Sequence, residues 1–176
     1  MGTGLFIIDA IIIAIVILPF VLFINGRKKR QKKLQKALQS EASLHNCKLS
    51  KVETHSNFAI GIDSTEEKLF FYKETEEAAY AQTVDLKSIN ACKSIKEYKQ
   101  AKGNAKPNNV IDKIQLSFIH RNQKDATHLV LYNNNDEMTL NNELVVAQKW
   151  QDYITEFLES KVEVQTSETS KHVATA

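Results

Sequence analysis

Residues 57–73 read NFAIGIDSTEEKLFFYK, and this stretch decides the fold class. Phe58, Ile60 and Ile62 alternate with small residues, which is the period-two pattern of a β-strand with one face in a core. The polar run DSTEEK separates this strand from a second apolar run, LFFYK. Two such runs around a short polar turn predict a β-hairpin over residues 57–73.

Further antiparallel strands are predicted on both sides of the hairpin. Extended runs occupy residues 80–86 and 89–98, around a turn at Lys87–Ser88, and then residues 111–120 and 126–132. A weaker edge strand is expected around Cys47–His55. Residues 99–109 contain Gly, Pro and several Asn, which predicts a loop. The chain therefore supplies six or seven strands before its last helix.

The helical period returns after the polar run NNNDEM. Asn141 or Asn142 is a suitable N-cap for this helix. Its apolar face consists of Leu144, Ala147, Trp150 or Gln151, Ile154, Phe157 and Leu158, with charged residues opposite. Residues 161–176 show no sustained pattern and are expected to form a disordered tail.

The N-terminal segment has a different composition. Residues 5–24 read LFIIDAIIIAIVILPFVLFI, with Asp9 as their one charged side chain. A helix of this length is about 30 Å long, which is the thickness of the hydrocarbon core of a bilayer. A cleaved signal peptide would need positive charge before the apolar run, and here the positive charge follows it. These residues therefore predict a transmembrane helix.

A block of basic residues follows the apolar segment and sets the expected orientation. Its seven cations are Arg27, Lys28, Lys29, Arg30, Lys32, Lys33 and Lys36. Because Lys and Arg are retained on the cytoplasmic side, we expect a single-pass inner (plasma) membrane protein with its N-terminus outside and its folded part in the cytoplasm. The helix is expected to continue into this neck, where the cations would contact anionic lipid.

Asp9 lies about one turn inside the apolar run and has two interpretations. It is either an intramembrane polar site, such as an ion site or a contact with a partner helix, or a carboxylate that reaches the outer interface. Its position near the end of the run favours the second interpretation.

The order of strands followed by one Trp-bearing amphipathic helix resembles the pleckstrin-homology-like (PH-like) superfold, with Trp150 at the matching position. The segment FAIGID, then LFFYK and TVDLKSINAC, also looks like a recurrent bacterial membrane-anchored version without assigned function. The resemblance covers residues 47–160. It implies an α+β fold class: a transmembrane helix plus a mostly antiparallel β sheet or barrel closed by the C-terminal amphipathic helix.

The expected organisation has four parts: residues 1–26 as the membrane helix with its short outer N-terminus, 27–46 as a basic helical neck, 47–160 as the PH-like domain and 161–176 as the tail. Phosphoinositide-binding members of the superfold use a basic loop between their first two strands. Here that loop is Asp63–Glu67, which is acidic, or is almost absent if the first strand is Cys47–His55. The lipid-binding function is therefore not transferred.

Signatures of catalysis and of cofactor or metal binding are weak in this sequence. It has no phosphate-binding glycine motif, no nucleophile elbow and no His pair at metal-ligand spacing on a helix. His120 and His128 could face each other across a hairpin, but two ligands do not make a zinc site. Cys47 and Cys92 stand apart in the sequence and are expected to be reduced. We therefore expect no catalytic residue, cofactor or metal.

Three functional hypotheses follow from these patterns. The first is a non-enzymatic adaptor that presents its domain to an unidentified protein partner. The second is recognition of a lipid head group or small ligand, assisted by the basic neck. The third is a small enzyme with an unfamiliar site around His120 and His128. Nucleic-acid binding is disfavoured, because no aromatic side chains are interleaved with the basic block and the residues after it carry more acidic than basic side chains.

Overall fold

The computed structural model describes residues 3–99, 110–122, 126–137 and 139–173. In the N-terminal helix the side chains are described at residues 13 and 15–17 and from residue 24 onward, and in the C-terminal helix they are described up to residue 161. The loop expected at 99–109 lies almost wholly outside the described residues. The elements in chain order are α1 (Thr3–Leu44), β1 (Lys51–His55), β2 (Phe58–Asp63), β3 (Lys68–Glu74), β4 (Ala79–Asp85), a 3₁₀ turn η1 (Leu86–Ser88), β5 (Ile89–Tyr98), β6 (Ile111–His120), β7 (Ala126–Asn133) and α2 (Glu143–Val173).

The first four strands form an antiparallel sheet in the order β1-β2-β3-β4. The hairpin predicted over residues 57–73 is confirmed as β2 and β3, whose register pairs Phe58 with Lys73 and Asp63 with Lys68. The weaker edge strand is also confirmed, because β1 pairs with β2 alone. Alternation therefore placed these strands correctly.

The last three strands form a second antiparallel sheet in the order β5-β6-β7. The strand predicted over residues 89–98 is confirmed as β5, and the alternating run around Ile114, Leu116 and Phe118 is confirmed as β6. These three apolar side chains are fully buried. They face the core that the second sheet shares with the first.

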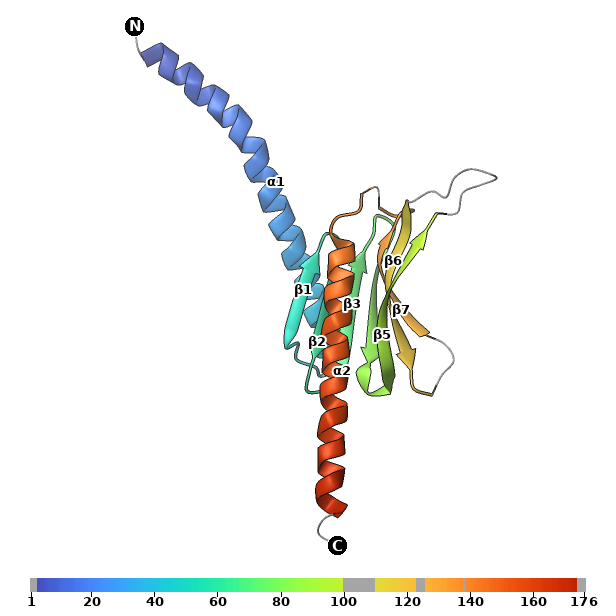
Figure 1. Cartoon of the computed structure of the whole chain (residues 1–176). Helices are drawn as coiled ribbons and strands as arrows, with labels where there is room; N and C mark the ends of the chain where they lie inside the picture. Colours follow the sequence, from blue (N-terminus) through green and yellow to red (C-terminus); the bar gives the residue numbers. More distant parts are fainter. Residues whose placement is uncertain (1–2, 100–109, 123–125, 138, 174–176) are drawn as a thin grey trace, which may run out of the picture.

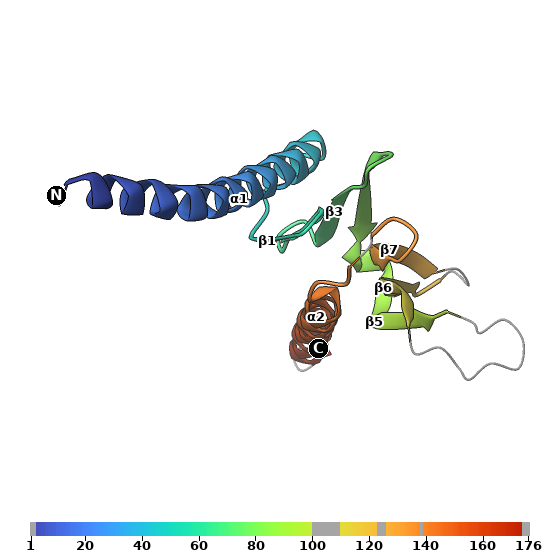
Figure 2. The same ribbon diagram turned by 90° about the horizontal axis from the view of Figure 1, so that it is seen from above.

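The fold class expected from the sequence needs a correction, because the described strands form two separate sheets that do not close into a barrel. The extended conformation is interrupted between β4 and β5, where Asp85 caps η1 and its side chain accepts a hydrogen bond from the Lys87 N–H. This turn ends the ladder of the first sheet, so β5 starts a new sheet. α2 lies between the two sheets (Figures 1 and 2) and packs Trp150 and Ile154 into their common core.

The membrane prediction also needs a correction. Within the part of the chain that the structure describes, no helix is long and apolar enough to cross a bilayer. The predicted transmembrane helix, and with it the single-pass topology and the inner-membrane location, is therefore wrong on this finding.

The second half of α1 packs against the outer face of the first sheet. Leu34, Leu38 and Ala42, spaced four residues apart on one side of the helix, are buried against Ala59 and Phe70. α1 and α2 consequently lie on opposite sides of this sheet (Figure 2). The first half of α1 extends away from the sheets (Figure 1), with exposed side chains at several of its described positions.

β2 is buried along its whole length because it has a helix on each side. Gly61 on its outer face permits the close approach of α1. A Cβ atom there would lie 3.0 Å from the Lys51 carbonyl oxygen and 3.1 Å from Leu38 Cδ2. Absence of a side chain at Gly61 thus sets the distance between helix and sheet.

α2 begins at Glu143, directly after the predicted N-cap residues, and continues to Val173. It therefore includes most of the segment that the sequence assigns to a tail. Asn142 adopts a positive φ of 56° and its carbonyl accepts the Val146 N–H. The Glu143 carboxylate accepts the Asn141 N–H, so an acidic side chain of the first turn binds a backbone donor before the helix.

The acidic turn between β2 and β3 is organised by Asp63, which is 3% exposed. Its carboxylate accepts the backbone N–H groups of Lys48 at 2.6 Å, Thr65 at 2.9 Å and Glu66 at 3.1 Å. Burial acts to raise the pKa of this carboxyl, but the three backbone donors outweigh it and hold the pKa below its ordinary value.

Asp63→Asn is expected to destabilise the protein by about 1–3 kcal/mol near neutral pH, because the new amide would point a donor at the Lys48 N–H. A carboxyl whose pKa is lower in the folded protein than in the unfolded chain stabilises the fold at a pH above its unfolded pKa, which is near 3.9. This stabilisation is lost as the pH falls through the pKa of the folded protein. Urea unfolding of both proteins between pH 7 and pH 2 should show the difference shrinking below about pH 4. A constant difference over this range would contradict the assignment.

Candidate functional site

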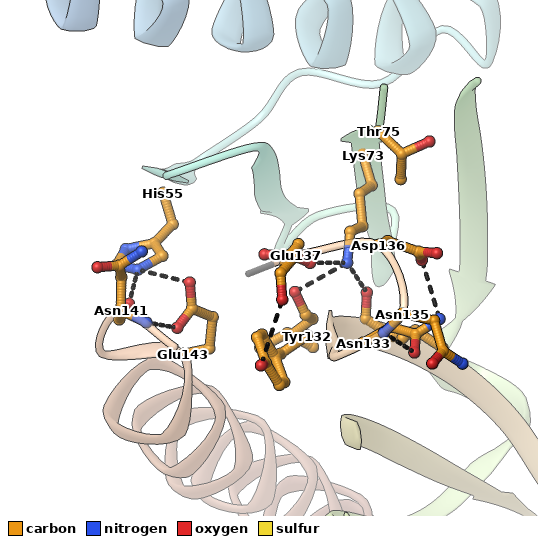
Figure 3. A network of polar contacts seen from close by, with 12 residues as sticks. His55, Lys73, Thr75, Tyr132, Asn133, Asn135, Asp136, Glu137, Asn141 and Glu143 are labelled. Carbon is orange, nitrogen blue, oxygen red and sulfur yellow. Dashed lines mark hydrogen bonds and ion pairs between the residues drawn. The ribbon is translucent and has the colours of Figure 1, made fainter. Parts of the chain in front are cut away.

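A buried lysine joins the two sheets at one end. Lys73 on β3 is fully buried, and its Nζ donates to the Val130 and Leu131 carbonyls of β7 at 3.2 and 3.0 Å. The same Nζ lies 2.7 Å from Glu137 Oε1, in the loop before α2 (Figure 3). Every proton of the ammonium group thus has an acceptor, so this contact links β3, β7 and the loop.

A second polar group lies at the start of α2. His55 Nε2 contacts the Asn141 carbonyl and lies 3.6 Å from Glu143 Oε1 (Figure 3). The Glu143 side chain is fully buried, and this burial raises the pKa of its carboxyl. The backbone donors and His55 act to lower the pKa, but burial outweighs them. This group therefore joins β1 to the start of α2.

A polar cleft of about 420 Å³ adjoins this network. It is lined by residues of α1, of the β1–β2 and β3–β4 turns and of the loop before α2, among them Arg30, Asn57, Glu74 and Asp136. Asn57 is 6% exposed and its Oδ1 has no hydrogen-bond partner among the described residues. The acidic side chains of this cleft are partly neutralised, since Glu74 pairs with Lys33 and Glu137 with Lys73.

A depression of about 700 Å³ is open to solvent and follows the outer side of α2. Its lining includes Lys51 of β1, Lys96 of β5 and, from α2, Val145 and Tyr153. Lys51 Nζ lies 3.3 Å from the centroid of the Tyr153 ring, a cation–π contact. Val145 is 64% exposed. The depression therefore combines apolar side chains with cationic ones.

β5 borders this depression and is the edge strand of the second sheet. α2 covers part of that edge, where the Ser94 N–H donates to Gln151 Oε1 at 2.6 Å. The β5–β6 register has no shift between Ala91 and Glu97, so alternate residues direct their polar backbone groups to the same side. The Lys96 N–H and C=O therefore point to the same open side as the Ser94 N–H.

The buried Ser94 hydroxyl has no hydrogen-bond partner among the described residues. A buried hydroxyl without a partner costs free energy, which a bound group could recover. This hydroxyl lies two residues from Lys96 on the same strand.

The predicted membrane-surface residues lie on α1, where Arg27, Lys28 and Lys29 are among the exposed side chains. Lys33 Nζ contacts Glu74 Oε1 at 2.6 Å, and this hydrogen bond raises the pKa of Lys33. Part of the basic block thus faces the acidic β3–β4 hairpin of the same chain. Contact of the other cations with anionic lipid stays a prediction. Asp9 lies on α1, but its side chain is outside the described residues.

The histidines and cysteines singled out in the sequence do not converge. His120 Nε2 lies 2.8 Å from Thr127 Oγ1, whereas His128 is exposed and opposite Ser117. Among the described residues no three His, Cys, Asp or Glu side chains are grouped to hold a metal ion. Cys47 and Cys92 are free and belong to different core clusters, and burial raises the pKa of Cys92 to about 12.

No family model, curated protein or solved structure matches this chain. The resemblance to the PH-like superfold therefore stays a prediction.

Sequence reasoning missed the roles of Lys73, Glu137 and the β5 edge. The position of Lys73 was a detectable signal, because alternate residues of a strand share one face and Lys73 follows the buried Leu69 and Phe71 on that face. Glu137 lies in the polar run NNNDEM, and its sequence neighbours give no sign of the lysine that binds it. The open edge of β5 depends on where α2 lies, which no local pattern encodes.

Proposed function

We propose that this chain is a non-enzymatic protein-binding module that holds an extended segment of a partner protein against the β5 edge, beside α2. The observation that carries the proposal is the outward-facing backbone of Lys96 at the border of the 700 Å³ depression. An added strand would receive main-chain hydrogen bonds there, and its side chains would contact α2.

The composition of the surrounding surface supports this mode of binding. Val145 and Tyr98 are large apolar side chains that are more than half exposed, and they flank the open part of the edge. Lys51 and Lys96 lie beside acidic Asp152 and Glu156, so both charge signs are available to orient a bound segment.

The test uses peptides selected from a random display library on the purified full chain. Lys96→Pro removes one outward N–H and leaves the ladder to β6 intact, because proline is tolerated where the strand N–H faces away from the sheet. We expect Lys96→Pro to weaken the selected peptides at least about tenfold, or 1.4 kcal/mol. Lys96→Ala is the matched control, since it removes the same side chain and keeps the N–H.

Peptide titration followed by fluorescence anisotropy would measure both variants, with far-UV circular dichroism as the check on folding. Equal affinity of Lys96→Pro and Lys96→Ala would contradict strand addition at this edge. Failure of the library to yield any specific peptide would also count against a protein-binding function.

A further inference from the structure

The edges of the two sheets differ in how well they are protected against pairing with other strands. β1 carries Lys51, Glu53 and His55 on one face, and charged side chains discourage edge-to-edge pairing. β7 contains a register shift opposite Ile114–Gln115, and Lys73 binds two of its carbonyls. β5 is partly covered by α2. Each of these three edges thus has a feature that limits pairing.

β4 has none of these features in the described structure. It pairs with β3 alone, and its register runs without a shift from Asp85 to Ala79. Residues 78–84 read AAYAQTV and contain no charge, no proline and no glycine. The side chains of Ala79, Ala81 and Thr83 are exposed. An edge strand that is regular throughout and uncharged from Ala79 to Val84 is a template for another strand.

The hydrogen-bond pattern identifies the free backbone groups. The Thr75 N–H donates to the Ala78 carbonyl at 2.8 Å, so Ala78 directs its polar groups toward β3. Because alternate residues of an antiparallel strand direct their groups to opposite sides, Tyr80, Gln82 and Val84 also face β3. The N–H and C=O groups of Ala79, Ala81 and Thr83 then point outward, which makes three consecutive pairing positions.

We propose that β4 pairs antiparallel with β4 of a second copy of this chain, joining two four-stranded sheets across a twofold axis at Gln82. In this register Ala81 exchanges backbone hydrogen bonds with Thr83 of the other copy. This contact is separate from the β5 surface and does not depend on the proposed peptide binding.

Side-chain complementarity favours pairing with β4 of a second copy in this register. Tyr80 of one copy stands opposite Val84 of the other, an aromatic and β-branched pair of the kind that stabilises antiparallel sheets. The two Gln82 amides meet on the axis and can bond each other. At both ends of the paired strands the charged Asp85 stands opposite Ala79, so no like charges face each other within β4. One register step away, with Ala81 on the axis, Tyr80 would instead face Gln82, and the aromatic and β-branched pair would be lost.

Cysteine crosslinking of the full chain tests the geometry. In the proposed register the two Gln82 residues form a non-hydrogen-bonded pair with Cα atoms about 4.5 Å apart, within disulfide range. Gln82→Cys should therefore form a disulfide-linked dimer under mild oxidation. Thr83→Cys is the matched control on the same edge, because its counterpart lies two residues away along the strand. The native thiols are buried in different clusters, so the wild-type chain should not crosslink.

Sedimentation equilibrium over a concentration series tests the association itself. Ala81→Pro removes an outward N–H and should weaken dimerisation at least about tenfold, whereas Ala81→Ser should not. A wild-type chain that stays monomeric would overturn the proposal. So would self-association that Ala81→Pro leaves unchanged, or crosslinking of Thr83→Cys as fast as that of Gln82→Cys; the crosslinking arm stands even if the proline variant fails to fold.

Discussion

Replacing Lys73 with Ala is expected to lower the free energy of unfolding by about 3–5 kcal/mol, because it breaks a buried ion pair by removing one partner. The ammonium group is fully buried and donates to two β7 carbonyls as well as to Glu137. Its removal leaves three acceptors without their donor and opens a cavity between the sheets. Urea unfolding monitored by Trp150 fluorescence measures the loss.

Two further variants separate the charge from the packing. Lys73→Met keeps most of the apolar stem, so it should cost less than Lys73→Ala. Adding Glu137→Gln to Lys73→Met should recover part of the loss, because it removes the unpaired carboxylate. Lys33→Ala is the control for an exposed pair and should leave the stability nearly unchanged. If Lys73→Ala behaved like Lys33→Ala, the lysine would not be joining the sheets.

Leu38→Ala is expected to cost about 2–5 kcal/mol, the range for deleting buried methyl groups from a core. Leu38 is fully buried between α1 and the outer face of the first sheet, with its Cδ2 against the position of Gly61. The cavity would loosen the contact of α1 with β2. Urea unfolding, together with protease sensitivity of residues 27–44, should report both effects.

Leu44→Ala is the matched control, because Leu44 lies on the same helix and is 76% exposed. It removes the same atoms from a site where they have little contact, so the expected change is within about 0.5 kcal/mol. Equal behaviour of the two variants would show that α1 does not pack on the sheet through Leu38.

Alternation of apolar and polar residues was sufficient to place the strands. The hairpin of β2 and β3, the long strand β5 and the pattern of β6 followed from side-chain period alone, because period two reports which face of a strand is buried. The same pattern showed that Ala59 and Gly61 lie on the opposite face of the strand from Ile60. It did not show that a helix covers that face.

The role of α1 could not be read from its sequence. An apolar run followed by basic residues is typical of a membrane helix with a cytoplasmic neck. The narrow stripe of Leu34 and Leu38 in that neck instead packs on the sheet, and its partner Phe70 lies far along the chain. Contacts at such a separation depend on the tertiary fold.

By itself the sequence determined most elements of this protein: a helical segment at each end, six or seven strands between them and the inward face of most strands, because these depend on neighbouring residues and their period. Only the tertiary structure decided that the strands divide into two sheets, that Lys73 lies between them, and that the edges of β4 and β5 stay open. These features result from packing between residues distant in sequence, where shape and hydrogen-bond partners are settled together.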